Sequence, residues 1–462
     1  MRFGEARRIH LVGIGGTGMN GIAEVLINLR YTITGSDLQE SPVVERLRRL
    51  GGTIHVGHAA QHVRQADVVV TSTAVRPDNP EVIEAHRLGI PVIPRAEMLA
   101  ELMRMKSGIA VAGTHGKTSV TSMVAQVLHL AHLDPTIVIG GRLEILGASA
   151  KLGSGELMVV EADESDGSFL MLRPKTAVIT NVDREHLDHY GDLETLAAAF
   201  VDFANSVPFY GKVVACLDDP VVRGLLPRLT RSVITYGLSA EADLRATDLD
   251  FDGFVSRFRV QSRSEEIGPV TMRAPGHHQV VNALAALAVG LDCGVAFQQA
   301  ARALGSFGGA DRRFQKKGTS NDILVIDDYA HHPTEIRATL AAARAGWERR
   351  LVVVFQPHRY TRVRDLLGEF GRSFAQAETV LVTDIYPAGE TPIPGVTGQA
   401  VARAIHETGH PRVHFVGDVD QVPPALVEAV LPGDLVITLG AGSVTRVGDR
   451  FLSLMGGRRK EA

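Results

Sequence analysis

Residues 108–120 read GIAVAGTHGKTSV, and this stretch predicts the fold at the centre of the chain. The apolar residues 109–112 predict a buried strand, and the turn GTHGKTS leads into a helix expected to end near Ala131. Such a turn cradles phosphate, because its backbone N–H groups and the helix N-terminus bind phosphate oxygens. Lys117 is placed to span the β- and γ-phosphates, and the Thr118 hydroxyl to bind Mg2+. The chain is therefore predicted to bind ATP.

This turn is a shortened form of the usual phosphate-binding loop. The common eight-residue pattern needs a glycine five positions before Gly116, where this chain has Val111. The alternative is an ordinary glycine-rich turn with a solvent-exposed lysine, which the flanking strand and helix make the weaker interpretation. The predicted ATP-binding residues of the turn are Gly113, Thr114, His115, Gly116, Lys117, Thr118 and Ser119.

Composition limits the function classes. The chain has 462 residues, which suggests about three domains, and a net charge of −4 with lysine and arginine interspersed. This charge gives no reason to expect nucleic acid or an anionic membrane as a partner. Cys216 and Cys293 match no metal-binding spacing and are expected to be buried thiols in a reducing compartment. With neither a signal peptide nor a long apolar run, the protein is predicted to be cytoplasmic.

Residues 9–105 alternate short strands with helices, which predicts a parallel sheet. Helices are expected to begin near Pro42, Pro80 and Pro94. Gly13, Gly15 and Gly18 form the pattern G-x-G-x-x-G, and Asp37 follows about twenty residues on. This pattern is typical of sites in which a pyrophosphate lies on a helix N-terminus and an acidic side chain lies near a ribose. NAD and a UDP-sugar both satisfy this pattern. A dehydrogenase is therefore an alternative, although no strong hydride-transfer site follows.

The middle of the chain is predicted to carry a metal-binding acid. The strand at residues 157–161 ends in EADESD, and a Mg2+-holding carboxylate, here Glu161, lies at that place in phosphate-loop proteins. The alternative is a solvated acidic loop. His186, with Asp188 beside it, is a candidate second metal ligand, whereas His189 is expected to be an ordinary surface or packing residue. Residues 244–275 predict an antiparallel meander, and Asn282 on the next helix either reads adenine or is a surface amide.

The third part of the chain is predicted to bind a small zwitterion. Four successive strands, near residues 323–326, 351–355, 380–383 and 434–438, end in polar or glycine-rich clusters. Arg359 and Arg362 are spaced to hold a carboxylate, and a histidine near neutral pKa is a natural base for an amine. ATP, a nucleotide-linked substrate and an amine together suggest an acyl phosphate that the amine captures. Lys117 and the metal would catalyse its formation by positioning and charge neutralisation.

The motifs GTHGKTS, EADESDGSF, TNVDREHLD, RRFQ, DDYAHHPTE and FQPHRYTR together resemble the Mur ligase family, over nearly the whole chain. The resemblance implies an α/β fold of three domains, Rossmann-like, phosphate-loop type and Rossmann-like, here at residues 1–106, 107–306 and 307–462. Within the family the chain is most similar to the branch that adds L-alanine to UDP-N-acetylmuramate in peptidoglycan synthesis. The implied cofactors are ATP and Mg2+, the first glycine turn holds UDP rather than NAD, and a monomer or homodimer is expected.

The resemblance also implies site residues. Those expected to be catalytic are Lys117, His186, His358 and Arg359. Two more on the ATP side are Asn282 and Arg313. Those expected to bind the metal are Thr118, Glu161 and His186. Those expected to bind the UDP substrate are Gly15, Gly16, Thr17, Gly18, Asp37, Ser72 and Asn79, with Glu81 in the same loop. Those expected to bind the amino acid are Tyr329, His358, Arg359 and Arg362, with His331 nearby.

Two positions bear on the branch. Gln279 stands where the family commonly has asparagine, which leaves adenine contact there open, and Val201 stands where relatives that add later amino acids carry a modified lysine. The second difference favours the alanine-adding branch. The remaining alternatives are a murein tripeptide ligase of cell-wall recycling, a Rossmann oxidoreductase and a non-catalytic ATP-binding regulator.

Overall fold

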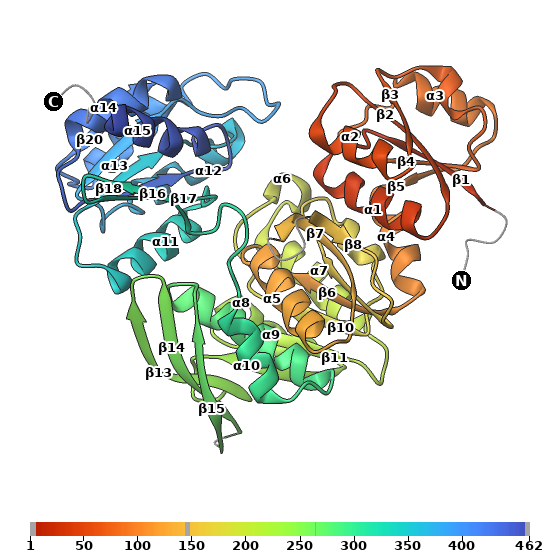
Figure 1. Cartoon of the computed structure of the whole chain (residues 1–462), viewed down its shortest axis with the longest axis horizontal. Coiled ribbons are helices and arrows are strands. Elements are labelled where there is room, and N and C mark those ends of the chain that lie inside the picture. The colour runs from red at the N-terminus through yellow and green to blue at the C-terminus, as the bar shows by residue number, and fades with distance from the viewer. Residues whose placement is uncertain (1–5, 144–147, 264, 458–462) are drawn as a thin grey trace. The chain divides into compact units, whose positions relative to one another are not determined.

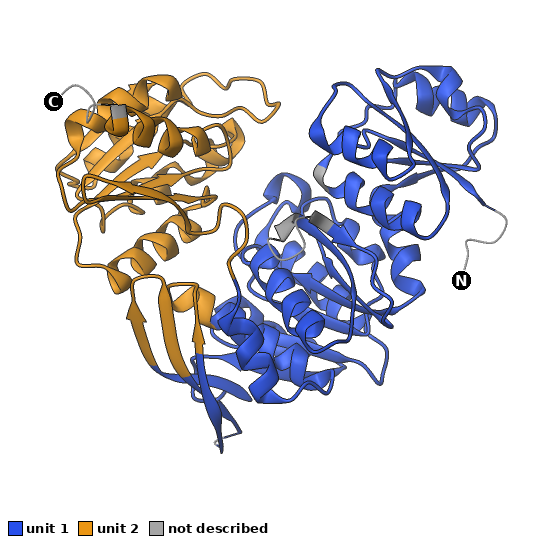
Figure 2. Cartoon of the chain, in the orientation of Figure 1, with its two compact units in different colours: residues 1–248, 259–270, 281–307 blue, residues 249–258, 271–280, 308–462 orange. Residues whose placement is uncertain are grey.

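The computed structural model describes residues 6–143, 148–263 and 265–457 (Figure 1). The chain divides into two compact units (Figure 2): the first comprises residues 1–248, 259–270 and 281–307, and the second comprises residues 249–258, 271–280 and 308–462. Three mostly parallel sheets with helices between their strands confirm the predicted fold class. None of the described helices is long and apolar enough to cross a membrane.

The first sheet has five parallel strands in the order β3-β2-β1-β4-β5. Strand order reverses between β1 and β4, and ligands bind at the carboxyl ends of strands beside such a reversal. Helices begin at Pro42, at Pro80 and next to Pro94, as predicted. The third starts at Arg95, because Pro94 is the N-cap and keeps an extended backbone with φ −70° and ψ 153°. The elements are β1 (Arg8–Val12), α1 (Thr17–Asn28), β2 (Thr32–Asp37), α2 (Pro42–Arg49), β3 (Thr53–Val56), η1 (Ala60–Val63), β4 (Val68–Thr71), α3 (Pro80–Arg87), β5 (Val92–Pro94) and α4 (Arg95–Arg104).

The second sheet has ten strands in the order β15-β14-β13-β12-β11-β10-β6-β9-β7-β8. In the centre of the sheet β6 lies between β9 and β10 and pairs parallel with both. The residues that follow these three strands therefore meet at one edge of the sheet. The elements are β6 (Ser107–Ala112), α5 (Lys117–Leu130), β7 (Thr136–Leu143), β8 (Ala148–Lys151), β9 (Leu157–Glu161), η3 (Ser168–Met171), β10 (Thr176–Ile179), α6 (Leu187–Tyr190), α7 (Leu193–Asn205), β11 (Lys212–Cys216), α8 (Pro220–Leu225), η4 (Leu226–Arg228), β12 (Ser232–Gly237), β13 (Leu244–Asp252), β14 (Val255–Ser262), β15 (Glu265–Met272), α9 (His277–Asp292) and α10 (Phe297–Gly305).

The predicted meander is formed by β13, β14 and β15 at one end of this sheet. Two residues join β13 to β14, which is too short for a parallel crossover, so these strands run antiparallel as predicted. Of the two cysteines expected to be buried, Cys216 is buried but Cys293 is only half-buried, because it follows the last turns of α9.

The third sheet has six strands in the order β16-β17-β21-β18-β19-β20. Alternate residues of β17 belong to separate buried clusters, Leu324 and Ile326 to one and Ile323 and Val325 to the other, so both faces of the sheet are covered. The elements are β16 (Gln315–Ser320), β17 (Ile323–Asp328), α11 (Pro333–Gly346), β18 (Leu351–Phe355), α12 (Tyr360–Gly371), β19 (Thr379–Thr383), α13 (Gly398–Glu407), β20 (Val413–Gly417), η5 (Val419–Gln421), α14 (Val422–Ala429), β21 (Leu435–Leu439) and α15 (Thr445–Gly457).

The four strands predicted to end in polar clusters are β17, β18, β19 and β21. The prediction that these four strands follow one another along the chain is wrong, because β20 intervenes between β19 and β21. They are nevertheless neighbours in the sheet, since β21 inserts between β17 and β18. Their carboxyl ends therefore meet at one edge.

Candidate active site

The glycine-rich turn between β6 and α5 is tightly enclosed. Gly113 and Gly116 have positive φ, 135° and 81°, which other residues rarely adopt. A Cβ atom at Gly113 would lie 1.9 Å from the hydroxyl oxygen of Thr180, just after β10, and one at Gly116 would lie 2.9 Å from Oδ1 of Asn282. Asn282 is buried, so it is not the surface amide of the alternative interpretation but lies against the turn.

Residues that follow β10 hold the backbone of this turn. The Thr180 hydroxyl donates to the His115 carbonyl oxygen (2.6 Å), and the Asn181 side chain accepts from the His115 N–H (2.8 Å) and donates to the same carbonyl (2.9 Å). The Asp183 N–H donates to the Thr114 hydroxyl (2.9 Å). The motif TNVD therefore fixes the shape of the phosphate turn, a role that the sequence did not reveal for Asn181.

Lys117 lies in a cage of oxygen atoms. Its ammonium group donates to the Gly113 carbonyl (2.7 Å) and to both carboxylate oxygens of Glu164 (2.9 and 2.7 Å), and the Thr114 carbonyl lies at 3.3 Å. Burial alone would lower the pKa of Lys117, but the carboxylates of Glu164 and Asp163 raise it above its ordinary value. Lys117 is therefore a largely enclosed cation, with its side chain 15% exposed, whose counterion Glu164 is fully buried.

Two of the three predicted metal ligands lie together. The Thr118 hydroxyl donates to the carboxylate of Glu161 (3.0 and 3.1 Å), which also accepts from the Gly140 N–H (2.8 Å). Burial raises the pKa of Glu161, although Lys117 and these hydrogen bonds oppose the rise. A hydroxyl and a carboxylate are oxygen ligands of the type that Mg2+ takes, so this pair fits the predicted ion. The third, His186, has Nε2 at 3.7 Å from Glu164 rather than beside Glu161.

The glycine turn after β1 has the predicted relation to Asp37. The Gly15 N–H donates to Asp37 Oδ2 (2.8 Å), and a Cβ atom at Gly15 would lie 2.9 Å from the same oxygen. The Gly16 N–H donates to the Gly13 carbonyl (3.1 Å), and Gly18 lies against the side chain of Arg95. The predicted Thr17 contact falls on a side chain outside the described part of the structure. The turn is therefore built at the strand-order reversal where a ligand is expected.

The other predicted UDP-side residues have structural contacts of their own. The Asn79 side chain caps α3 by accepting from the Glu81 N–H (2.9 Å), and the Ser72 carbonyl accepts from the Val75 N–H (3.0 Å). Both residues therefore have a structural contact within the protein itself. Their predicted binding roles remain predictions.

Glu81 is the centre of a buried polar cluster in the first sheet. Its fully buried carboxylate accepts from the Ser36 hydroxyl (2.5 Å) and lies 2.7 Å from His62 Nδ1, 3.3 Å from His58 Nδ1 and 3.6 Å from His10 Nε2. Burial would raise the pKa of Glu81, but the nearby His10 and the hydrogen bonds to Ser36 and His62 outweigh it and lower the pKa to about 2. Glu81 is therefore an ionised carboxylate beneath the carboxyl ends of β1 and β2.

The second compact unit brings the predicted amino-acid residues together in a row of rings. Tyr329 and His331 meet edge to face (5.3 Å), His331 and His358 are 5.4 Å apart, and His358 stacks on Tyr386 at 5.6 Å with 9° between the rings. Arg362 Nη1 lies 3.1 Å from His358 Nδ1. Three of the four predicted side chains, Tyr329, His358 and Arg362, thus belong to one cluster.

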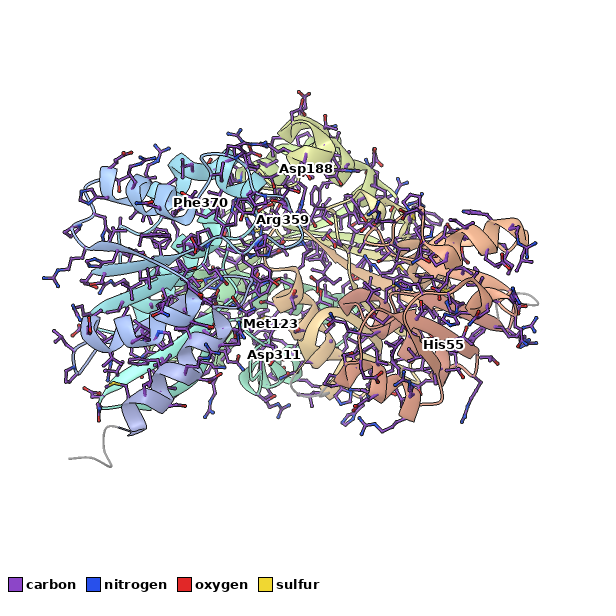
Figure 3. The ribbon with its side chains drawn as sticks, turned by 90° about the horizontal axis from the view of Figure 1, so that it is seen from above. His55, Met123, Asp188, Asp311, Arg359 and Phe370 are labelled. Carbon is purple, nitrogen blue, oxygen red and sulfur yellow. The ribbon has the colours of Figure 1, made fainter. Side chains whose placement is uncertain are left out.

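Arg359, labelled in Figure 3, completes this set from the loop after β18. Its φ of 66° is unusual for a residue with a side chain, and such strain persists only where neighbours enforce it. The Arg359 N–H donates to the Tyr386 carbonyl (2.9 Å), and the Tyr386 N–H donates to the Pro357 carbonyl (2.8 Å). Tyr386 therefore anchors the loop that carries His358 and Arg359, and the sequence reasoning had assigned it no function.

Arg313, predicted on the ATP side, also belongs to the second unit. Its guanidinium lies 5.1 Å from the Tyr329 ring centre, that of Arg312 lies 5.0 Å from the same centre, and Arg313 Nη1 is 3.6 Å from Glu335. Burial, with Arg313 and His277 adding to it, lowers the pKa of His278 to about 4, so this histidine is neutral at pH 7. The ATP role of Arg313 remains a prediction.

Three family models match successive parts of the chain. The Mur ligase family catalytic domain matches residues 8–107, the Mur ligase middle domain residues 111–290, and the Mur ligase glutamate ligase domain residues 312–442. A curated protein of Syntrophotalea carbinolica is 56% identical over 447 residues, which cover 97% of this chain and 98% of that protein. This chain belongs to the Mur ligase family.

The relatives of this Mur ligase carry a consistent name. The Syntrophotalea protein and one from Myxococcus xanthus, 54% identical over 98% of this chain and 96% of its own, are both named UDP-N-acetylmuramate–L-alanine ligase. The crystal structure of UDP-N-acetylmuramate-alanine ligase from Thermotoga maritima matches with a TM-score of 0.82 at 29% identity, over 98% of this chain and 99% of that one. A murein peptide ligase from Psychrobacter arcticus matches with a TM-score of 0.69 at 27% identity, over 97% and 99%.

For this Mur ligase the structure adds residues that the sequence did not single out. Glu164 was visible only as one of four acids in EADESD, and nothing in that spacing distinguishes it from Glu161. Asn181 belongs to the motif TNVDREHLD, in which the sequence assigns it no function, and Tyr386 lies in one of the predicted polar clusters at strand ends.

Proposed function

We propose that this Mur ligase uses ATP to join the lactyl carboxylate of UDP-N-acetylmuramate to the amine of L-alanine, with release of ADP and phosphate. The observation that carries the proposal is a largely enclosed lysine, Lys117, next to a hydroxyl–carboxylate pair formed by Thr118 and Glu161, at the glycine-rich turn. That arrangement suits a nucleoside triphosphate with its metal. The two other substrates follow from the names of relatives at 54–56% identity over nearly the full chain.

In this proposal the substrate carboxylate attacks the γ-phosphate of ATP, and the resulting acyl phosphate is captured by the amine. Lys117 neutralises phosphate charge, while the turn and Asn282 position the nucleotide. Mg2+ would be held by Thr118 and Glu161, with His186 proposed as a third ligand, and would neutralise further phosphate charge.

The two glycine turns would receive different ligands. The turn after β1, with Asp37, would hold the uridine diphosphate group, because its N–H groups and the N-terminus of α1 favour anions. Arg359 and Arg362 would hold the carboxylate of the amino acid, and Tyr329 and His358 would line the same place. Cytoplasmic location, a monomeric or dimeric state and the domain limits 1–106, 107–306 and 307–462 belong to the same proposal.

A phosphate-release assay tests the proposed reaction. ATP, Mg2+, UDP-N-acetylmuramate and L-alanine are supplied together and each is then left out, with the murein tripeptide in place of L-alanine as the comparison. Phosphate release should need all four, L-alanine should be the preferred amine, and Lys117→Ala should abolish turnover without unfolding the protein. Lys316→Ala, on the exposed edge strand β16, is the matched control and should keep full activity. ATP consumption that does not respond to the sugar nucleotide and the amine would refute the proposal.

A further inference from the structure

We infer that His331 takes the proton from the amine of the amino acid, and that His358 serves instead as a hydrogen-bond donor to that substrate. The inference rests on the proposed function, because it assigns roles within the amino-acid site. It comes from the partners of the two rings, which determine which nitrogen of each imidazole carries the hydrogen. The ligand class concerned is a zwitterionic α-amino acid.

The partner of His331 fixes its tautomer. His331 Nδ1 lies 3.0 Å from the backbone carbonyl oxygen of Tyr329, and a carbonyl can only accept. Nδ1 therefore carries the hydrogen, and in the neutral ring the lone pair is on Nε2. A carboxylate oxygen of Glu335 lies 3.4 Å from the same Nδ1 and stabilises the positive charge that forms when Nε2 takes up a proton.

The partner of His358 has the opposite effect. Arg362 Nη1 lies 3.1 Å from His358 Nδ1, and a guanidinium can only donate. Nδ1 of His358 is therefore the acceptor, and Nε2 carries the hydrogen. While this contact lasts neither nitrogen can take a proton, and the adjacent positive charge disfavours an imidazolium. His358 can donate from Nε2, which suits the carboxylate of an amino acid rather than its ammonium group.

The surroundings of the two rings support this division. The His331 ring contacts both Tyr329 and His358. Glu335, in the first turn of α11, lies beside His331, and its carboxylate also accepts from the His331 N–H (3.1 Å). Arg312 and Arg313 lie over Tyr329, and Arg362 lies beside His358. A proton acceptor and a proton donor, 5.4 Å apart between ring centres, thus face a substrate that has one ammonium and one carboxylate.

With His331 as the base, every proton and bond in amide formation is accounted for. The ammonium group of L-alanine gives one proton to His331 Nε2, and the freed lone pair forms the C–N bond to the carbonyl carbon of the acyl phosphate. The C–O bond to phosphate breaks, and its electron pair leaves with the phosphate. The second proton lost from nitrogen goes to that phosphate, so the products are the amide, hydrogen phosphate and a protonated His331.

The test compares His331→Asn with His358→Asn. The first keeps an N–H for the Tyr329 carbonyl but has no basic lone pair, and we expect kcat to fall by about 10²–10³-fold with the KM for L-alanine within about threefold. The fall of kcat on the acid side of its pH profile should disappear. The second keeps an acceptor for Arg362, and it should raise the KM for L-alanine by about tenfold and leave the shape of the pH profile unchanged.

Hydroxylamine separates loss of a base from loss of structure, because this amine is already uncharged at neutral pH. His331→Asn should use hydroxylamine nearly as well as the unaltered enzyme does, and raising the pH should restore its activity with L-alanine. The inference is overturned if His331→Asn keeps its kcat and pH profile, if hydroxylamine does not rescue it, or if His358→Asn loses the acid limb. An unaltered enzyme that releases no phosphate with L-alanine would instead overturn the proposed function.

Discussion

Replacing Glu81 by glutamine should destabilise the first sheet in a way that depends on pH. The carboxylate of Glu81 is fully buried, and its pKa is lowered from an ordinary 4.5 to about 2 by the nearby His10 and by hydrogen bonds to Ser36 and His62. A group whose pKa is lower in the folded than in the unfolded protein stabilises the fold above its unfolded pKa. That stabilisation is lost as the pH falls from 4.5 toward 2.

The size of the effect follows from the two pKa values. The difference between 4.5 and about 2 corresponds to about 3 kcal/mol in the free energy of unfolding at neutral pH. Between pH 6 and pH 3.5, protonation of the unfolded chain removes about 1.4 kcal/mol of this contribution. Glutamine does not titrate, so Glu81→Gln should be less stable than the unaltered protein by about 3 kcal/mol at pH 6 and by about 2 kcal/mol at pH 3.5.

Hydrogen exchange in increasing urea, read from peptides of β1 and β2, measures the free energy of opening of this sheet separately from the rest of the chain. Glu84→Gln is the matched control, one turn further along α3, where the carboxylate is 10% exposed and pairs with Arg87, whose side chain is 64% exposed. Solvent weakens that pair, so its loss should cost much less. The reasoning fails if Glu81→Gln and the unaltered protein lose equal stability between the two pH values, or if Glu84→Gln is as damaging.

Three further substitutions have defined outcomes. Gly113→Ala should destabilise the protein by about 3 kcal/mol, seen as a lower melting temperature, because its Cβ would overlap the Thr180 hydroxyl at 1.9 Å. Thr118→Ala should raise the Mg2+ concentration needed for half-maximal phosphate release by about tenfold, and Thr118→Ser should restore it; an unchanged Mg2+ requirement would exclude Thr118 as a ligand. Tyr386→Ala should raise the KM for L-alanine by about tenfold while the KM for ATP stays constant, and Tyr386→Phe, which keeps the ring over His358, should behave normally.

The sequence predicted the architecture well wherever strands are buried on both faces. The apolar runs before Gly13, Gly113 and Asp327 became β1, β6 and β17, because continuous apolar runs between turn residues are typical of parallel strands under helices. Strand ends then placed polar residues at one edge of each sheet. Strands β16 and β20 escaped notice since they lie at sheet edges: QKKGTS is almost wholly polar, and β20 is largely exposed.

The spacing of residues in the sequence did not predict which side chains contact one another. Four acids lie within the six residues 161–166, which begin at the last residue of β9, and the path of the chain there decides that Glu164 reaches Lys117 while Glu161 reaches Thr118. In the same way the stacking of Tyr386 on His358 depends on β18 and β19 being neighbours in the third sheet, which their order in the chain does not guarantee. Local pattern identifies elements, but contacts between elements depend on the register of strands far apart in sequence.

An ammonium group has three hydrogens, and Lys117 is surrounded by four oxygen atoms of the protein. If ATP binds at Lys117 as proposed, its phosphate would have to replace a carboxylate that already neutralises the lysine. The affinity for ATP would then reflect the difference between two ion pairs rather than the strength of one, and the displaced Glu164 would need new hydrogen-bond donors nearby.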